Sequence, residues 1–599
     1  MSFVKRSSQL KHLSFSEKEE HGFLYRHADI FIFFLYLAVF YAFLLYYIKP
    51  VDGINDDWGM YSTLSGAYLG KPDAHVLFFL YPLSWFLCCL YKLNSSIPWY
   101  GLFQHALHIL CIWLIYHRTL HIRKKHFHSD SVVMPALVIL STLFFIVDFN
   151  IISEVQYTTT AGFCAATALF YFITTKSDES LSAFLKGNIP TFILAWITFS
   201  MRQNVLYMML PMAGILWLSK WLLSNQRFYL DYVLKLLSFA GILFIGMGIL
   251  YGAHMIAYSG EEWSDFIKIN HYRERVGDFY TWPDYEECSD ELTALGIDEE
   301  SYFYKKSGAP YIGYQMSLSD WEQIHQIAKD CYYARTPLES RLKNIAVGTL
   351  TVFLYQDGMQ PLNLCAAFLF LFTFCCIICN RNPVALAVYL LYLLGRMVTW
   401  AYILYQGRFP KRIIQPLIAA DIMVLFGILL AFNLINISRN KIYTILLPCI
   451  IVLSTISVYC TKVNIDSSYH ANQAVWNDLK EYCYAHPDNF YIWSYNSSTL
   501  DNYCESPFDT TLDTYQNFFY TNWGVVCNPN SRKKLAKHGI ENFGEDLAKN
   551  QNVYFIFKEG LYYDEHPVTM HFRHTYHVSC ELTDTFTAGG DTYEVYQLR

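Results

Sequence analysis

An acidic pair, Asp56-Asp57, follows the first long apolar run of this chain by only a few residues. A carboxylate close to a hydrocarbon layer is partly desolvated, which makes it more basic. Such a group can take a proton from a hydroxyl as a general base. The structural alternative is a solvated loop in which Asp57 caps a helix that begins near Trp58.

A cluster of cations, Arg408, Lys411 and Arg412, flanks Pro410 at the end of a later apolar run. Guanidinium groups bind phosphate oxygens in bidentate geometry. Positive residues normally stay on the cytoplasmic side of a membrane, so a cluster on the outer side indicates a bound anion such as a lipid phosphate. The alternative is that these long side chains reach the headgroup layer and anchor the helix.

Two further polar positions interrupt apolar sequence. Arg202 breaks the stretch 189–223, and an ionisable residue at such depth is a functional hypothesis by default. The alternative for Arg202 is a short outer turn between two helices. Glu154, with Tyr157 close by, can serve an acceptor or a metal, although the threonines at 158–160 are equally typical of an ordinary helix start.

The composition assigns these residues to a membrane protein. The chain has 599 residues, of which 54% are hydrophobic, 18% aromatic and only 16% charged, with a net charge of −7. Soluble proteins carry about 25% charged residues. The deficit excludes a disordered chain and argues against a purely soluble enzyme. Because no basic excess is present, nucleic-acid binding has no compositional support.

Apolar runs fill residues 29–256 and 361–460. A spanning helix needs about 20 mostly apolar residues, so these runs predict about 11–13 spans. The predicted fold class is mainly α, a polytopic transmembrane helical bundle. A large polar loop, 257–345, holds 17 acidic and 9 basic residues and many aromatic ones, which favours a folded loop over a linker.

The polar block 461–599 predicts a small α/β domain at the C-terminus. Val475, Leu479 and Tyr482 recur at helical spacing. Strand-like alternation covers four segments: 489–493, 553–558, 576–582 and 592–598.

Lys and Arg in the short loops predict the orientation. The N-terminal segment 1–28 and the basic loop 118–128 are expected in the cytoplasm. Three segments are then expected outside it: 49–75, 257–345 and 461–599. An odd number of crossings must separate Asp56 from the basic loop, yet two apolar runs lie between them. Pro82 favours 76–93 as the run that does not span.

The arrangement around the acidic pair resembles the GT-C superfamily of integral-membrane glycosyltransferases. The likeness covers most of residues 25–460, which makes 29–460 a GT-C-like domain with an outer catalytic loop at 49–75. Three segments carry it: Asp56-Asp57, Gly70–His75 and the Arg cluster at 408–412. Residues 97–101 and 262–273 are further similar to a group of Gram-positive bacterial membrane proteins of this architecture.

The resemblance implies an inverting transfer of a sugar from a polyprenyl-phosphate donor to an extracytoplasmic glycan or lipid in a bacterial cell membrane. It implies that Asp56 or Asp57 is the catalytic base. It also implies contacts to the donor phosphate from these residues: Lys71, His75, Arg202, Arg408 and Arg412. Glu154 lies where some members carry a second acid. The superfamily is divided on metal dependence, so a divalent cation is left open and no metal ligand is assigned.

The chain departs from the family pattern because it lacks a His-Pro-Pro-Leu run and a WWD-type motif, which argues against a protein sequon as acceptor. Two alternatives stay open. One is a surface-polysaccharide polymerase or ligase that uses the outer arginines on a lipid diphosphate. The other is a transporter of lipid-linked sugars, which is expected to show paired inverted repeats; none is evident in the sequence.

Overall fold

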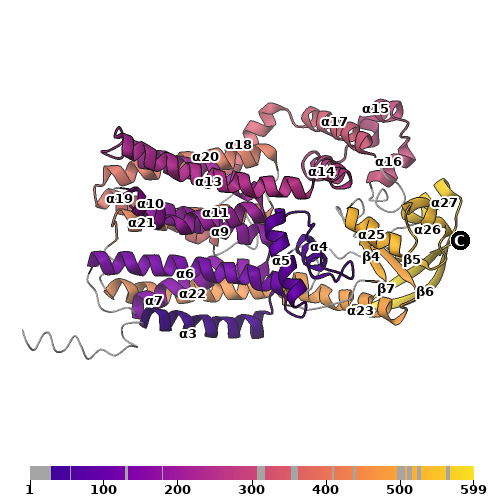
Figure 1. Ribbon diagram of the computed structural model, residues 1–599, viewed down its shortest axis with the longest axis horizontal. Helices are drawn as coiled ribbons and strands as arrows, with labels where there is room; N and C mark the ends of the chain where they lie inside the picture. The colour runs from indigo at the N-terminus through magenta and orange to yellow at the C-terminus, as the bar shows by residue number, and fades with distance from the viewer. Residues whose placement is uncertain are drawn as a thin grey trace, which may run out of the picture.

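A computed structural model describes most of the chain, namely residues 28–53, 55–127, 133–177, 180–306, 317–351, 362–407, 410–435, 440–494, 506–508, 516–521, 528–560 and 567–599. Long helices lie side by side along the longest axis of the molecule, and a mixed sheet lies beyond one end of them (Figure 1). The predicted class, a helical bundle with a small C-terminal α/β unit, is confirmed.

The bundle is built from the apolar stretches of the sequence. Its longer helices are α3 (Ala28–Phe43), α6 (Trp99–Phe127), α9 (Tyr157–Thr174), α11 (Ile189–Met201), α12 (Gln203–Leu222), α13 (Leu230–Ala257), α19 (Leu362–Cys379), α20 (Pro383–Gln406), α21 (Lys411–Ala431) and α22 (Asn440–Ile465). Its shorter pieces are η1 (Leu44–Ile48), α7 (Val133–Ser141), η2 (Thr142–Asp148), α8 (Phe149–Ser153), α10 (Leu181–Gly187) and α18 (Leu338–Thr351).

Within the described ranges, eight helical segments are long and apolar enough to cross a membrane, or nine if the bent pair α10–α11 is one span. This number is below the 11–13 spans predicted from sequence. The difference arises because α6 and α9 lie in the bundle (Figure 1) but carry many polar residues. Helix α5 (Tyr81–Leu93) has 13 residues and is about 20 Å long, too short to cross about 30 Å of hydrocarbon, as Pro82 indicated.

Helices α9 and α21 form the centre of the bundle. Every residue of α9 is buried, and α21 packs along it. A Cβ on Gly162 would lie 2.3 Å from the Cβ of Pro416, so only glycine permits this approach of the two helices. On the other side of α21, Asp421 accepts hydrogen bonds from Arg396 Nε at 2.8 Å and Tyr392 Oη at 2.7 Å.

The polar loops at one end of the bundle are folded. The first loop contains β1 (Val51–Asp52) and α4 (Asn55–Ser65), and β1 pairs in parallel with β2 (Glu154–Val155). The large acidic loop forms α14 (Glu261–Glu274), η3 (Arg275–Tyr280), η4 (Tyr285–Glu287), α15 (Ser289–Ala294), α16 (Glu299–Lys306) and α17 (Leu318–Arg335). It has its own apolar core around Trp321, Leu292 and Val276, which explains why so acidic a segment folds.

The C-terminal unit is a five-stranded sheet in the order β4-β3-β5-β7-β6. The strands are β3 (Phe490–Ser494), β4 (Phe518–Thr521), β5 (Val553–Lys558), β6 (Cys580–Ala588) and β7 (Asp591–Leu598), and the helices are α23 (Ala471–Ala485), α25 (Pro529–Lys537), α26 (Phe543–Lys549) and α27 (Pro567–Tyr576). Strands β3 and β5 run parallel, and the β6–β7 hairpin pairs antiparallel with β5.

The predicted helix around Val475 and three of the four predicted strands are confirmed, as α23, β3, β5 and β7. The remaining strand begins at Cys580 rather than Tyr576, because the residues up to Tyr576 form α27. Strand β4 was not predicted.

Candidate active site

The two adjacent aspartates of α4 point in different directions, because successive residues of a helix are about 100° apart. The side chain of Asp56 lines a cavity of about 200 Å³ at the end of the bundle. Asp57 is completely buried against the bundle helices. The structure therefore gives the members of the predicted acidic pair different environments.

Asp57 holds three elements together. It accepts hydrogen bonds from Tyr100 Oη at 2.7 Å, from Gln104 Nε2 at 3.3 Å and from the backbone N–H of Tyr157 at 3.1 Å. Tyr157 is the first residue of α9, so Asp57 accepts a hydrogen bond from an otherwise unpaired N–H at the start of α9 and does not cap its own helix. Burial raises the pKa of Asp57 to about 7, although the Tyr100 hydrogen bond opposes the rise.

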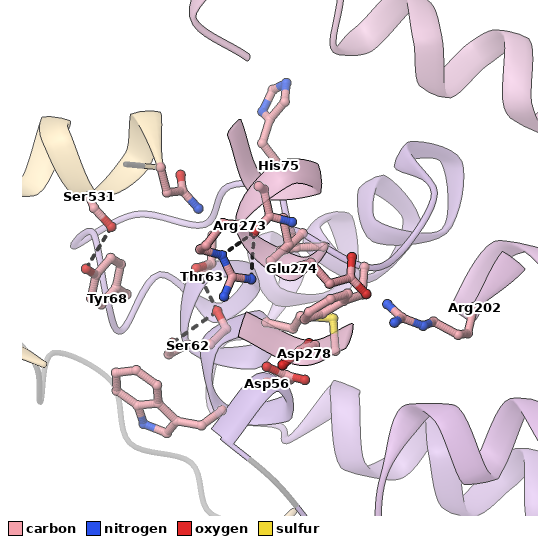
Figure 2. A pocket seen from close by; sticks show the side chains of 18 of the residues that line it. Asp56, Ser62, Thr63, Tyr68, His75, Arg202, Arg273, Glu274, Asp278 and Ser531 are labelled. Atoms are coloured by element: carbon pink, nitrogen blue, oxygen red, sulfur yellow. Dashed lines mark hydrogen bonds between the residues drawn. The ribbon is translucent and has the colours of Figure 1, made fainter. Parts of the chain in front are cut away.

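The cavity brings together charges from distant parts of the chain. Arg202, Arg273 and Arg412 line it together with Asp56, Glu274 and Asp278. Figure 2 shows Asp56, Asp278 and Glu274 near one another, with the guanidinium of Arg202 pointing toward them from the right of the view. Arg412 Nη1 lies 3.8 Å from Asp56 Oδ2, a charge contact longer than a hydrogen bond. The lining thus has room for a charged group between its acids and its cations.

Two opposing influences act on the Asp56 carboxyl. Burial raises its pKa above the ordinary value, while the guanidinium groups of Arg412, Arg202 and Arg273 lower it. The net effect is a raised pKa, because the loss of hydration destabilises the carboxylate more than the attraction of these separated charges stabilises it. A carboxylate of raised pKa is a stronger base whenever it is ionised.

Arg202 is positioned by aromatic rings. It lies between α11 and α12, with its guanidinium carbon 4.8 Å from the ring centroid of Phe78 and 5.7 Å from that of Tyr157. The two rings are themselves stacked, with centroids 5.2 Å apart. Cation–π contacts of this kind hold a guanidinium without using its hydrogen-bond donors. Tyr157 therefore supports Arg202.

A second cavity of about 170 Å³ adjoins the first. The two share Leu77, Phe78, Arg202 and Asn270. The rest of the second lining combines apolar and aromatic side chains with polar ones and adds no Asp, Glu, Lys or Arg. It comes from α5, α12, α13 and α14 and the segments next to them: Leu80, Gln203, Asn204, His254, Tyr258, Trp263, Phe266 and Ile267. Arg202 thus lies where the cavity lined by six charged side chains meets a second cavity whose described lining has no other charged one.

His75, which the resemblance placed near the donor phosphate, also lines the first cavity. Its ring stacks on Trp263 at 5.1 Å, and its Nδ1 lies 2.8 Å from Asp73 Oδ1. Lys71, four residues earlier, is exposed and lies apart from the described residues that line this cavity. The loop from Gly70 to His75 therefore contributes its histidine to the cavity and its lysine to the surface.

Glu154 is held in a different place. Lys411 Nζ lies 3.0 Å from both of its oxygens, and Asn464 Nδ2 lies 2.5 Å from Oε1. These contacts join the end of α8 to α21 and α22, outside the described lining of the cavity. Arg408 lies outside the described residues. Among the residues that the structure describes, no group of three His, Cys, Asp or Glu side chains is arranged to hold a metal ion.

Sequence reasoning missed the contribution of the acidic loop. Asn270, Arg273, Glu274 and Asp278, at the end of α14 and in η3, all line the cavity. Arg273 donates to Asn270 Oδ1 from Nε at 3.1 Å and from Nη2 at 2.9 Å, which fixes its guanidinium. The alternating charges at 273–278 were the available signal, but the sequence does not say that this segment folds back over α4.

The C-terminal unit completes the cavity. Asn528 and Ser531, at the start of α25, belong to its lining. Ser531 Oγ lies 3.1 Å from Tyr68 Oη, and Asn530 Nδ2 donates to the carbonyl of His75 at 3.2 Å (Figure 2 shows the former). The cavity is consequently bounded by the bundle, the acidic loop and the α/β unit.

Comparisons with known proteins give little further information. No family model and no curated protein matches this chain. One solved structure, ArnT from Cupriavidus metallidurans bound to undecaprenyl phosphate, aligns over 94% of this chain and 97% of that chain, with 10% sequence identity and a TM-score of 0.37. A TM-score below 0.5 is too low to assign a shared fold. The chain is a multi-pass membrane protein with a charged cavity at one end of its helices.

Proposed function

We propose that this protein is a membrane glycosyltransferase of the GT-C type, which moves a sugar from a polyprenyl-phosphate donor to an acceptor outside the cytoplasm. The observation that carries the proposal is the position of Arg202, at the junction of a cavity lined by six charged side chains, Asp56 among them, and a second cavity in whose described lining Arg202 is the one Asp, Glu, Lys or Arg. A lipid-linked sugar likewise has two parts joined at a charged group, because its phosphate lies between a sugar and an isoprenoid chain.

The donor can lie across the two cavities in one orientation. Its isoprenoid chain would enter the second cavity between α12, α13 and α14, and its phosphate would contact Arg202. Arg412 and Arg273 would face the same phosphate across the first cavity. Because guanidinium groups bind phosphate oxygens in bidentate geometry, three of them stabilise the phosphate as it leaves.

The chemical step needs one base. The acceptor hydroxyl attacks the anomeric carbon of the sugar, a new C–O bond forms on the face opposite the phosphate, and the bond between that carbon and the phosphate oxygen breaks. Asp56 takes the hydroxyl proton, and the lipid phosphate leaves as an anion. This single displacement inverts the anomeric configuration. Asp57 does not share the role, because its side chain is completely buried, outside the lining of the cavity, and its Oδ1 accepts hydrogen bonds from Tyr100, Gln104 and Tyr157.

The test uses the purified chain in lipid nanodiscs with a panel of radiolabelled polyprenyl-phosphate sugars and an envelope fraction as acceptor. We expect transfer of label by the wild-type chain and by Asp265→Asn, an exposed control on α14. We expect none above background from Asp56→Asn. A polymerase or ligase without a carboxylate base would tolerate Asp56→Asn, and a transporter would move the donor without separating sugar from phosphate. Either result would overturn the proposal.

A further inference from the structure

A strongly basic helix borders the cavity. The nine residues of α25 include Arg532, Lys533, Lys534 and Lys537 and no acidic residue. Lys71 belongs to the loop along which α25 packs. Of these five cations, Lys534 alone is buried, and the other four are exposed. This group of four exposed cations, Lys71, Arg532, Lys533 and Lys537, is called the α25 patch below.

The helix is fixed against the loop at residues 68–75. Lys537 Nζ donates to the carbonyl of Leu69 at 2.5 Å. Lys533 lies near Asp73. The pKa of Asp73 is lower than usual: burial alone would raise it, but the hydrogen bonds from His75 and the charge of Lys533 outweigh that effect. The Lys534 ammonium lies 4.2 Å from the ring centroid of Tyr68. The α25 patch therefore has a defined position relative to the loop that carries His75.

The patch and the cavity share helix α25. Ser531 and Asn528 line the cavity, and Arg532 and Lys533 follow directly on the same helix. The α/β unit lies beyond the ends of the bundle helices (Figure 1), so the patch is not on the apolar flank of the bundle. A molecule bound to the patch could reach the cavity without entering the bilayer.

The charge on the other side of the cavity is opposite. The acidic loop, 257–345, has 17 acidic and 9 basic residues and presents Glu274 and Asp278 to the cavity. A polyanion would be repelled by this loop and attracted by α25, so only one approach is favourable. A neutral acceptor would gain nothing from such an asymmetry.

We propose that the α25 patch binds an anionic polymer, with phosphodiester or carboxylate groups in its repeat, and presents one of its hydroxyls to the cavity as the acceptor. The inference rests on the proposed function and adds the acceptor class to it. Several separated cations suit a chain of repeating anions, because each contact is weak while together they hold the polymer. The role of the C-terminal unit is then acceptor recognition.

The test measures binding without catalysis. The full-length chain in nanodiscs of neutral lipid is titrated with poly(glycerol phosphate), and with dextran as the neutral comparison. We expect Arg532→Glu/Lys533→Glu to raise the dissociation constant for the polyanion roughly tenfold or more and to reduce its salt dependence. Arg532→Gln/Lys533→Gln should lie between this variant and wild type. Lys549→Glu, a charge reversal on α26 where the side chain is 74% exposed, is the matched control.

Three results would overturn the inference: unchanged affinity in the double charge-reversal variant, equal binding of dextran, or a preference of the patch for vesicles of anionic phospholipid over the polymer. The last would make the patch a membrane contact. If the polymer binds through α25 but no labelled sugar is transferred to any acceptor, the proposed function fails and the anion-binding surface stands. If both hold, the double variant should raise KM for the polymer while donor binding stays at the wild-type value.

Discussion

Two regions of this protein place an aspartate near an arginine, with different outcomes. Inside the bundle, Asp421 is fully buried and accepts hydrogen bonds at 2.8 Å from Arg396 and 2.7 Å from Tyr392. At the end of the bundle, Asp56 and Arg412 approach only to 3.8 Å, with a cavity beside them. The first arrangement has matched partners in contact, and the second leaves room between charges.

The difference separates structural charges from chemical ones. A buried ion pair offsets the cost of burying each charge only if both partners are matched. The cavity instead holds three guanidinium groups and three carboxylates around a space of about 200 Å³. A ligand of mixed charge can complete that arrangement, whereas nothing can be inserted between Arg396 and Asp421. The comparison therefore predicts which substitutions change activity and which change stability.

The largest expected effect is on catalysis. Asp56→Asn removes the proposed base, and loss of a general base lowers the rate by about 10²- to 10⁴-fold. Asp57→Asn keeps an oxygen for Tyr100 and the backbone of Tyr157, so its activity should exceed that of Asp56→Asn by at least about tenfold. Single-turnover transfer of radiolabelled sugar measures both. If the two variants are equally inactive, the distinction between the neighbours is wrong.

Next in size is a loss of stability without a selective loss of chemistry. Asp421→Ala leaves the Arg396 guanidinium without its carboxylate and should destabilise the bundle by about 3–5 kcal/mol. Replacing both partners, as in Arg396→Met/Asp421→Leu, should recover most of this. Thermal unfolding in detergent checks both variants. Asp56→Asn should unfold near the wild-type temperature, and a large shift there would show that Asp56 is a structural charge as well.

A smaller effect is expected on donor binding. Arg202→Ala removes a charge-assisted contact to the proposed phosphate, which corresponds to about 10- to 100-fold weaker binding. Arg202→Lys keeps the charge but not the paired N–H donors of a guanidinium, so its affinity for the donor should lie between that of wild type and that of Arg202→Ala. Quenching of tryptophan fluorescence by a polyprenyl phosphate measures the dissociation constant. Unchanged affinity in Arg202→Ala would place the phosphate elsewhere.

The pH dependence gives a finer test. Asp56 must be ionised to act as a base, and burial raises its pKa above the ordinary value. Activity should therefore fall as the pH falls through that raised pKa, and the acid limb should lie above pH about 4. Arg412 is the foremost of the charges that lower this pKa, so Arg412→Ala should move the acid limb to higher pH. Movement to lower pH would contradict the assignment.

The smallest effect is expected at Glu154. Glu154→Gln keeps an acceptor for Asn464 but weakens the contact with Lys411, so stability should fall by about 1 kcal/mol. Transfer per folded molecule should stay within about twofold of wild type, as for other changes outside an active site. Parallel activity and unfolding measurements distinguish the two effects. A loss of activity without a loss of stability would show that Glu154 takes part in the reaction.

Local patterns were sufficient to predict most of the fold. Apolar runs predicted the bundle, the position of Pro82 predicted that 76–93 does not span, and alternation around residues 553–558 predicted the sheet. Fewer described helices pass as spans by length and composition than the sequence predicted, because α9 is rich in threonine although all of it is buried in the bundle. Strand β4 has only four residues, too few for alternation to be recognised.

The site was predictable only where a charge was out of place. Asp56, His75, Arg202 and Arg412 interrupt or border apolar sequence, and the structure brings all four to one cavity. Glu154 and Lys71 stand out equally in the sequence but lie elsewhere. Residues such as Arg273 and Asp278 belong to an ordinary polar segment, and only the folding of α14 over α4 gives them a role.

The close approach of Gly162 to Pro416 has a mechanical consequence. Tyr157 lies about one turn before Gly162 on α9, and Arg412 lies about one turn before Pro416 on α21, so both belong to two closely packed helices. The facing wall consists of α14 of the acidic loop and α25, whose Leu535 belongs to the same apolar core as the bundle helices. We therefore expect Arg412 to keep its position while substrates enter and leave, so that a bulky lipid must fit to this cation rather than the cation to the lipid.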